Sequence, residues 1–527
     1  MKNIISYVLV VLCFIKTSAQ NGEQVFNDSI IHTLYIETSM PDWFSVLDED
    51  YKQNIVDPNL YPQIYRSCNI TWDGLTISNC GFRQKGNASN LFTSFGRKKP
   101  LKISFDEFAN QTLNGLKNIN LNNFTNDPSL LHDVISNKLF RDCGIFAPRT
   151  SYVKLWVDNE YIGLYLTIEN VDKTFLKKCY GNAFNDGNLY KTDRGAQVHL
   201  KWLGSDKSAY EDKGLKLNTN ETVNDWSKLI SFIDLINNNS EDDFRQKFEA
   251  NFDVHTYIKI LAIEKCLRSW DSYWGGGNNF YLYEHPDGII RWIPWDMNET
   301  FQDVKIISGT SILDGYLVPA NRFDDRPLLK RIFEIEDYKT EYLNYSCDLI
   351  QSKFTLSNLG QYIFNQHNLV DETYKLDPNR YNRYDAFKTS LTEDNIDDVT
   401  ISKSGFELRI KYPGIYPFIQ SQREWVVKQL KGWEQSCNIE DKSSYTLSVF
   451  PNPTTNSINV ANLNLEFEFA QFKLYDFTGK LVFATDYDIM NGAHYNLPLE
   501  NINSGIYLLL KQSADGKLGK AKIVVLK

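Results

Sequence analysis

The stretch WDSYWGGGNNFYLY, residues 270–283, lies between two different hydrophobic patterns. Before it, DVHTYIKILAIEKCLRSW (residues 253–270) has the spacing of a long, apolar α-helix, with Asp253 as its predicted N-cap. After it, FYLYEHPDGIIRWIPWD (residues 280–296) predicts two strands joined by a turn at the Pro-Asp-Gly sequence. The pattern therefore predicts a helix, a polar loop and a hairpin in this order.

Three polar residues mark the joints of this arrangement: Asp271 in the loop, Asn279 before the first strand and Asp296 after the second. Because a hairpin returns the chain to its starting edge, we expect these side chains to lie together. Protein kinases place a catalytic-loop aspartate and two metal ligands in the same order. Phosphoryl transfer needs a carboxylate near the acceptor hydroxyl and oxygen ligands for Mg²⁺.

The spacing between these residues differs from that of kinases. Asn279 follows Asp271 by eight positions, whereas the kinase catalytic loop separates the two by about five. A loop aspartate is also a common turn former or helix cap. The order of the residues thus leaves a structural role for Asp271 open.

The remainder of the chain mixes strands and helices. Residues 25–123 and 150–169 show short apolar runs separated by turn residues, typical of strands. Residues 127–144, 226–270 and 327–433 have helical patterns. We therefore predict an α+β domain at 25–437, a polar linker at 438–446 and, at 447–527, a small all-β sandwich.

Charge and hydropathy exclude several classes of protein. The 527 residues carry a net charge of −10, which argues against nucleic-acid partners. The first 19 residues, with Lys2, an apolar run and small residues up to Ala19, predict a secretory signal peptide. No later segment is apolar enough for a transmembrane helix. We expect an exported protein.

Seven cysteines follow the predicted cleavage site, namely Cys68, Cys80, Cys143, Cys179, Cys266, Cys347 and Cys437. Some can pair in an oxidising compartment, and the odd number leaves at least one thiol without an intramolecular partner. None forms a metal-binding pattern with a second cysteine or a histidine. We expect structural rather than catalytic roles.

Several motifs between residues 27 and 435 resemble the spore-coat protein H (CotH) kinase family, an atypical protein-kinase-like group. They are FRQKGNAS (82–89), KKPLKISFD (98–106), LNNFTNDPSLLHDVISNKLFRDCGIFAP (121–148), DNEYIGLYLTIENVDKTFL (158–176), GNLYK (187–191), NNFYLY and WIPWDMNETF. The resemblance implies a two-lobed, kinase-like fold that binds ATP and Mg²⁺.

This resemblance also implies roles for single residues. Asp271 would be the catalytic-loop carboxylate, Asp296 the principal Mg²⁺ ligand, and Asn279 a further ligand. Two positions depart from the family pattern. Asn298 stands where the family often has a second acid, so it would be a weaker, neutral ligand, and Asn278 stands where a histidine is common.

Basic residues that could neutralise phosphates occur in the early strands. Arg83 and Lys85 are two positions apart, so on a strand they face the same side, and a glycine-containing turn follows. Lys102 lies in the strand pattern LKISF, as the nucleotide lysine of a kinase does. Glu169, at the end of a strand, could pair with Lys102. Each of these residues could instead be a solvated surface charge.

The segment after residue 447 resembles the type A C-terminal sorting domain of the type IX secretion system of Bacteroidetes. Its motifs are FPNP (450–453), YDFTGK (475–480), GIY (505–507) and the terminal KIVVLK. By resemblance, the protein would engage the type IX machinery and be released or held on the outer cell surface.

Together these features predict a secreted kinase that transfers the γ-phosphoryl group of ATP to Ser or Thr hydroxyls of an exported protein. Free ATP is scarce outside the cell, so transfer would precede complete export, or the domain would serve as a binding module. The second alternative is a carbohydrate-binding or adhesive protein, because aromatic residues make up 14% of the chain. A third is a glycoside hydrolase that uses Asp271 and Asp296 as its carboxylates.

Overall fold

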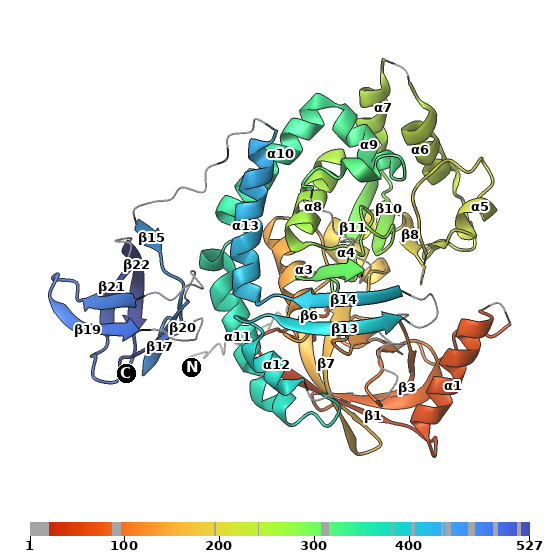
Figure 1. The fold of residues 1–527 in the computed structure, drawn as a ribbon. Helices are drawn as coiled ribbons and strands as arrows, with labels where there is room; N and C mark the ends of the chain where they lie inside the picture. Colours follow the sequence, from red (N-terminus) through yellow and green to blue (C-terminus); the bar gives the residue numbers. More distant parts are fainter. Residues whose placement is uncertain are drawn as a thin grey trace, which may run out of the picture.

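The structure, a computed structural model, describes residues 21–58, 60–86, 96–193, 196–240, 242–306, 316–380, 383–401, 406–433, 437, 444–461, 469–488, 494–513 and 518–527. The predicted signal peptide and residues 438–443 of the predicted linker lie outside these ranges. None of the described helices is long and apolar enough to cross a membrane. The predicted mixture of helices and sheets is confirmed (Figure 1).

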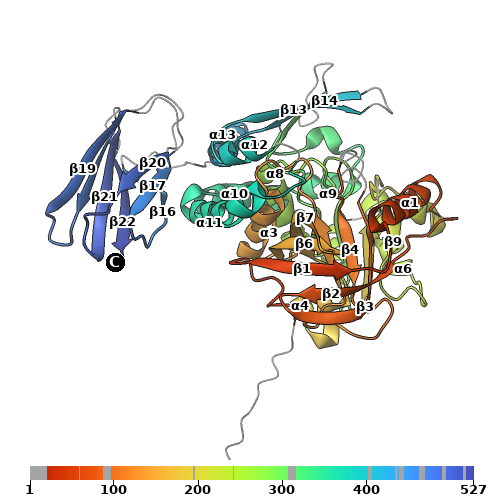
Figure 2. The ribbon, with the colours of Figure 1, turned by 90° about the horizontal axis from the view of Figure 1, so that it is seen from below.

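Seven strands of the N-terminal part close into a barrel in the order β1-β2-β3-β4-β5-β7-β6 (Figure 2). Strands β1 and β6 are parallel, and the other neighbours are antiparallel. The strands are β1 (Ile31–Glu37), β2 (Arg66–Trp72), β3 (Leu75–Gln84), β4 (Leu101–Ser104), β5 (Asn118–Asn122), β6 (Thr150–Val157) and β7 (Glu160–Glu169).

The register of the barrel fixes which side chains face inward. Phe82, Ile103 and Ile119 are laterally paired on β3, β4 and β5, and all three are buried in the barrel core. Successive residues of a strand point to opposite faces. The next lateral pair, Arg83 and Lys102, therefore points out of the barrel.

Helix α8 (Val254–Leu267) is the centre of the largest hydrophobic core. The Asp253 side chain accepts a hydrogen bond from the Thr256 amide at 3.2 Å and caps the helix, as predicted. Nearly all of its residues are buried, which explains why its sequence is apolar on every side. Around it and the barrel lie α1 (Trp43–Val56), α3 (His132–Asp142), α4 (Lys173–Tyr180), α5 (Ser208–Glu211), α6 (Ser227–Asn238), α7 (Phe244–Asn251), α9 (Pro327–Glu334), α10 (Glu336–Ser352), α11 (Leu356–Lys375), α12 (Tyr384–Thr389) and α13 (Ile415–Lys431).

The predicted hairpin after α8 is confirmed. Strands β10 (Phe280–Glu284) and β11 (Ile290–Pro294) pair antiparallel, with Phe280 opposite Pro294. They continue into a four-stranded sheet of order β11-β10-β8-β9, which includes β8 (Asn188–Thr192) and β9 (Leu215–Leu217). A further sheet, β12-β14-β13, contains β12 (Asp303–Ile306), β13 (Asn395–Ile401) and β14 (Phe406–Tyr412).

The C-terminal part consists of two sheets that share one hydrophobic core, as expected for a small sandwich. The larger sheet has the order β15-β22-β21-β18-β19, and the smaller has β16-β17-β20. Their strands are β15 (Ser444–Thr446), β16 (Val449–Phe450), β17 (Ser457–Ala461), β18 (Phe469–Tyr475), β19 (Leu481–Asp488), β20 (His494–Pro498), β21 (Gly505–Ser513) and β22 (Leu518–Val525).

The β-sandwich lies against helices α11 and α13 of the larger domain (Figure 1). The Phe450 ring, from the predicted FPNP motif, is buried with its centroid 4.2 Å from that of Phe364. The Ser448 hydroxyl donates to the Leu356 carbonyl at 2.8 Å. Burial of one phenylalanine contributes about 1.5–3 kcal/mol, so this contact favours docking of the two parts.

One disulfide joins Cys347 of α10 to Cys437, just beyond α13. It crosslinks α10 to the segment that follows α13, close to the point where the chain leaves for the β-sandwich. The other described cysteines, Cys68, Cys80, Cys143, Cys179 and Cys266, are free thiols. The prediction that some cysteines pair while at least one stays free is confirmed.

Candidate functional site

The loop after α8 turns the Asp271 carboxylate toward the start of β10. Arg268 ends the helix in a left-handed conformation, with φ of 52°. The Asn278 side-chain amide donates to Asp271 Oδ1 at 2.8 Å, and the Asn279 side-chain amide donates to Asp271 Oδ2 at 2.9 Å. The Asn279 amide also donates to the Asp271 carbonyl at 2.8 Å. Both carboxylate oxygens are thus oriented by neutral donors.

The three glycines of this loop are packed against other atoms. A Cβ at Gly275 would lie 1.8 Å from the Trp270 carbonyl oxygen, and one at Gly276 would lie 2.9 Å from Asp271 Oδ1. Gly277 has φ of +82°, and its Cβ would meet the His199 ring at 2.8 Å. The glycines therefore allow the loop to fold tightly around Asp271, and they do not open space for a bulky ligand.

A buried guanidinium holds the same loop from the other side. Arg326 is 2% exposed; its Nε donates to the Tyr273 carbonyl and its Nη2 to the Gly275 carbonyl, both at 2.6 Å. These charge-assisted bonds satisfy two carbonyls that the tight turn leaves outside regular secondary structure. Arg326 is thus a positioning residue for the loop.

The hairpin brings the second aspartate beside this loop. Phe280 pairs with Pro294, so Asn279, just before β10, and Asp296, two residues after β11, lie at the same end of the hairpin. Both adopt left-handed backbone conformations, with φ of 59° and 58°. Such conformations cost about 1–2 kcal/mol outside glycine and are concentrated at functional sites. The Asn279 side chain thus contacts Asp271, and the charge of Asp296 acts on the Asp271 carboxyl, as expected for three residues that lie near one another.

Two further acids join them, and we call Asp271, Asp296, Asp133 and Glu299 the acidic set. The Asp133 carboxylate, on α3, accepts a hydrogen bond from the Met297 amide at 3.1 Å. Burial is the main reason why the pKa of Asp133 is raised and that of Asp271 is raised to about 7. The negative charge of Asp296 is the second reason in both cases. Burial raises the pKa of Glu299 to about 8. The acidic set is therefore a group of carboxylates that repel one another when charged.

Four cations from the barrel and β8 lie close enough to act on one another, and we call Arg83, Lys85, Lys102 and Lys191 the basic set. Lys85 and Lys191 feel the charge of Asp296, whereas Arg83 lies over the Tyr65 ring. Burial lowers the pKa of Lys85 to about 8, whereas the charge of Asp296 opposes this change. Burial, then the charges of Lys191, Arg83 and Lys85, lowers the pKa of Lys102 to about 7. Burial also lowers the pKa of Lys191, again against the charge of Asp296.

Asn298 lies at the edge of the acidic set. Its side-chain amide donates to Glu299 Oε1 at 3.2 Å, and its backbone carbonyl lies 3.0 Å from Nδ1 of the buried His132. An acid is thus present one position later than the pattern predicted. Among the described residues, no group of three or more His, Cys, Asp or Glu side chains is arranged to hold a metal ion.

Glu169 does not pair with Lys102, so this prediction was wrong. Glu169 is laterally paired with Ile119 and points into the barrel, while Lys102 belongs to the neighbouring lateral row and points out. The Glu169 carboxylate instead forms ion pairs with Arg149 and Lys178. The carboxylate whose charge favours protonated Lys102 is Asp172, the N-cap of α4.

Comparison with known proteins assigns both parts of the chain. The family model described as CotH kinase protein matches residues 82–412, more than half of the sequence. The chain belongs to this family. Residues 448–526 match the secretion system C-terminal sorting domain. This CotH-family protein therefore carries a tail for the type IX secretion machinery, which implies secretion or a cell-surface location in a bacterium.

Known relatives match about half of this chain at low identity. Inner spore coat protein H of Bacillus subtilis (strain 168) is 26% identical over 296 residues, which cover 55% of this chain and 77% of that protein. Invasin CotH7 of Rhizopus delemar is 21% identical over 261 residues, covering 48% of this chain and 42% of that protein. The chain thus spans less than half the length of the fungal relative.

Sequence reasoning gave no role to three residues of the two sets in the CotH domain. Lys191 ends the GNLYK motif, Asp133 lies in the predicted helix of residues 127–144, and Glu299 lies in the NETF sequence. All three occur inside family motifs, which was the available signal. Their roles depend on which helix and strands meet at the site, and spacing along the chain does not contain this information.

The packing of the glycine loop can be tested by substitution. Gly275→Ala would place a Cβ against a backbone oxygen, so we expect the unfolding free energy to fall by about 1–3 kcal/mol. Gly276→Ala meets only side-chain oxygens, so the loss should be smaller, about 1 kcal/mol. Urea denaturation measures both. Gly432→Ala, at the end of α13, is the control, and a Gly275→Ala protein as stable as this control would contradict the account.

Proposed function

We propose that the CotH domain transfers the γ-phosphoryl group of ATP to a Ser or Thr hydroxyl of an exported protein. The observation that supports the proposal most is that Asp296 of the acidic set lies close enough to Lys85 and Lys191 of the basic set for its charge to act on both. Mg·ATP carries both a cation and a polyanion. Its binding would reduce the repulsion within each set, because the metal meets the carboxylates and the phosphates meet the lysines.

The residues present fit such a ligand. Mg²⁺ in phosphotransferases is usually held by one or two carboxylates together with phosphate oxygens and water, rather than by a complete protein cage. Asp296, with Asn279 and Asn298 as neutral ligands, would hold it. When bound, Mg²⁺ would neutralise charge on the phosphates. Arg83, Lys85 and the other members of the basic set would hold the phosphate oxygens.

Asp271 would orient the acceptor hydroxyl and take its proton. Its carboxylate is fixed by the Asn278 and Asn279 amides, and this leaves lone pairs for one further donor. A carboxylate with a pKa near 7 is a stronger base than an ordinary aspartate and is still partly deprotonated at neutral pH. The two-lobed, kinase-like arrangement and an origin in Bacteroidetes belong to the same proposal.

Burial of the aromatic rings disfavours the carbohydrate-binding alternative at this site. Tyr273, Trp274, Trp292 and Trp295 are all buried, and Trp270 is half-buried. Such rings offer no exposed face on which a sugar could stack. A catalytically weak domain that only binds its ligand stays an alternative, because neutral Asn298 stands where the family often has an acid.

Substitution of the two aspartates separates binding from transfer. Asp296→Asn should abolish the rise in melting temperature caused by Mg·ATP, because it removes the principal metal ligand. Asp271→Asn should keep this rise but lower labelling of a casein-like acceptor from γ-labelled ATP by about 100-fold. Asp324→Asn, at an exposed position, is the control. Full labelling by Asp296→Asn protein would contradict the metal assignment.

The basic set predicts an unusual dependence of stability on pH. The pKa of Lys102 falls from an ordinary value of 10.5 to about 7 in the folded protein. The Lys102 charge therefore lowers the free energy of unfolding by its full amount below about pH 7. This destabilisation decreases as the pH rises toward 10.5. Lys102→Met should raise the melting temperature at pH 6–7, by about 2–4 °C for each 1 kcal/mol gained.

This gain should disappear near pH 10.5, while the stabilisation of the protein by Mg·ATP should be lost at every pH. Lys216→Met, at an exposed position on β9, should show neither effect. A drop in melting temperature for Lys102→Met at pH 6–7 would show that the lysine stabilises the empty site, contrary to the proposal.

A further inference from the structure

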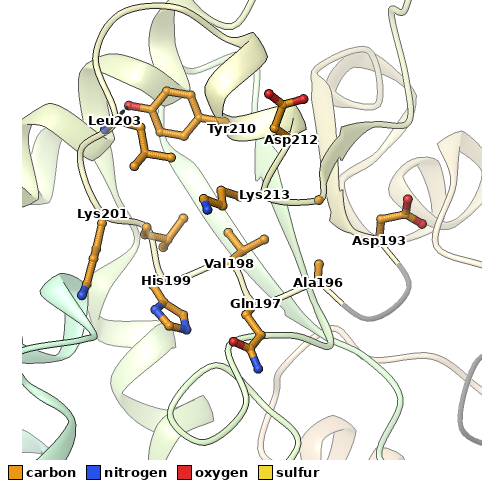
Figure 3. A pocket seen from close by; sticks show the side chains of 12 residues that line it. Asp193, Ala196, Gln197, Val198, His199, Lys201, Leu203, Tyr210, Asp212 and Lys213 are labelled. Carbon is orange, nitrogen blue, oxygen red and sulfur yellow. Dashed lines mark hydrogen bonds between the residues drawn. The ribbon is translucent and has the colours of Figure 1, made fainter. Parts of the chain in front are cut away.

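The cavity beside the loop that carries Asp271 presents little apolar surface to a ligand (Figure 3). Its volume is about 580 Å³, and its apolar floor, formed by Ala196, Val198, Leu200 and Tyr210, is only 2–8% exposed. The exposed side chains at its rim carry charges of both signs, so they select no single class of ligand. An open apolar surface occurs instead on the C-terminal β-sandwich.

The outer face of the larger sheet of the β-sandwich carries apolar side chains. On β21, Tyr507 and Leu509 are buried in the core of the β-sandwich. Because successive residues of a strand point to opposite faces, Ile506, Leu508 and Leu510 point outward. Ile506 is 53% exposed and Leu508 is 42% exposed. This strand thus presents large apolar groups to solvent.

The strand register extends this apolar surface over the neighbouring strands. Leu508 is paired with Tyr475 of β18, and Tyr475 is paired with Leu481 of β19, which is 45% exposed. On the other side, Ile506 is paired with Val524 of β22. We call Tyr475, Leu481, Ile506, Leu508 and Val524 the outer row. A continuous exposed apolar patch of this kind is typical of a surface that binds another protein.

Lysines border the outer row. Lys522 and Lys520 of β22 are paired with Leu508 and Leu510, and both lysines are exposed. Lys473 of β18 is paired with Leu510 from the other side. Protein interfaces commonly have an apolar centre and a polar rim, and the charges of the two rims are complementary. The face therefore fits a partner surface that is apolar at its centre and acidic at its border.

Three sequence motifs of the tail meet on this face. Tyr475 begins YDFTGK, Ile506 is the middle residue of GIY, and Lys522 begins KIVVLK. The motifs are separate in the sequence, and the pairing of β18, β21 and β22 brings them side by side. Packing of the core accounts for the buried Tyr507 and Ile523, whereas it gives no role to the exposed Ile506 and Lys522. The outward members of the motifs thus indicate a contact outside the fold.

The opposite side of the β-sandwich is covered by the CotH domain. On the smaller sheet, Val449 and Val460 are buried in the core of the β-sandwich, whereas Phe450 and Ala461 belong to the core of the CotH domain. The smaller sheet thus lies between the larger sheet and helix α11 (Figure 2). The outer row is on the side that faces away from the CotH domain, so a partner can reach it while the two parts are docked.

We infer that the outer row is the surface by which the type IX secretion machinery holds this protein, and that the component in contact with it presents an apolar surface bordered by carboxylates. The family match assigns this partner to the tail as a whole, and the inference adds the face and its chemistry. A second copy of the chain is a poorer occupant, because two such faces would bring two basic borders together. The inference is independent of the proposed phosphotransferase function.

Export of matched variants of the full chain tests the inference in a bacterium that has a type IX system. Ile506→Glu places a charge in the outer row, and Ile396→Glu makes the same change at a 61% exposed position on β13 of the CotH domain. A pulse-chase experiment measures the rate at which each chain reaches the cell surface or the medium. Ile506→Glu should lower this rate about tenfold, the effect expected when one apolar side chain is lost from an interface. Ile396→Glu should leave it unchanged.

Two milder variants separate loss of the contact from misfolding of the tail. Ile506→Thr keeps a β-branched residue on the strand, and Lys522→Glu reverses one border charge; both should slow export while the melting temperature of the purified chain stays unchanged. Normal export of Ile506→Glu, or of both milder variants, would overturn the inference. A dimer of the purified chain that Ile506→Glu dissociates in sedimentation experiments would also overturn it, because a second copy would then cover this face.

Discussion

The contact of the Asp271 carboxylate with the Asn278 and Asn279 amides is the constraint on which the site depends. It joins the end of α8, the central helix of the largest core, to the start of the β10–β11 hairpin. Three glycines make this contact sterically possible, and the buried Arg326 satisfies two carbonyls of the same turn. The register of the β10–β11 hairpin then places Asp296 at the same end of the hairpin as Asn279.

Once this geometry is fixed, electrostatics gives the site its character. The acidic set and the basic set each gather like charges with limited access to water, and each arrangement opposes folding. Protein folds retain such costs where a ligand of complementary charge binds. Asn298 weakens the acidic set compared with the family pattern, while Glu299, one residue later, places a carboxyl group in the same region. The site is thus altered and still rich in acids.

The sequence predicted well the features formed by residues close together in the chain. It predicted poorly the contacts that depend on strand register and tertiary packing. Helix α8 with its Asp253 cap, the hairpin, and the meeting of Asp271 with Asn279 follow from patterns within about 45 residues, where periodicity and turn chemistry decide the structure. Glu169 was misplaced because its partner depends on strand register across β4, β5 and β7, and a shift of one residue reverses the face. Lys191 and Asp133 were missed because tertiary packing brings them to the site.

The central claim is that the two sets together form a site for Mg·ATP. Isothermal titration of the protein with ATP, once with Mg²⁺ and once with excess EDTA, tests it most directly. The account predicts binding at least tenfold tighter with Mg²⁺, because phosphates alone would leave the carboxylates charged and unpaired beside a polyanion. Equal affinity for ATP in EDTA, or no binding of ATP with Mg²⁺ present, would contradict it.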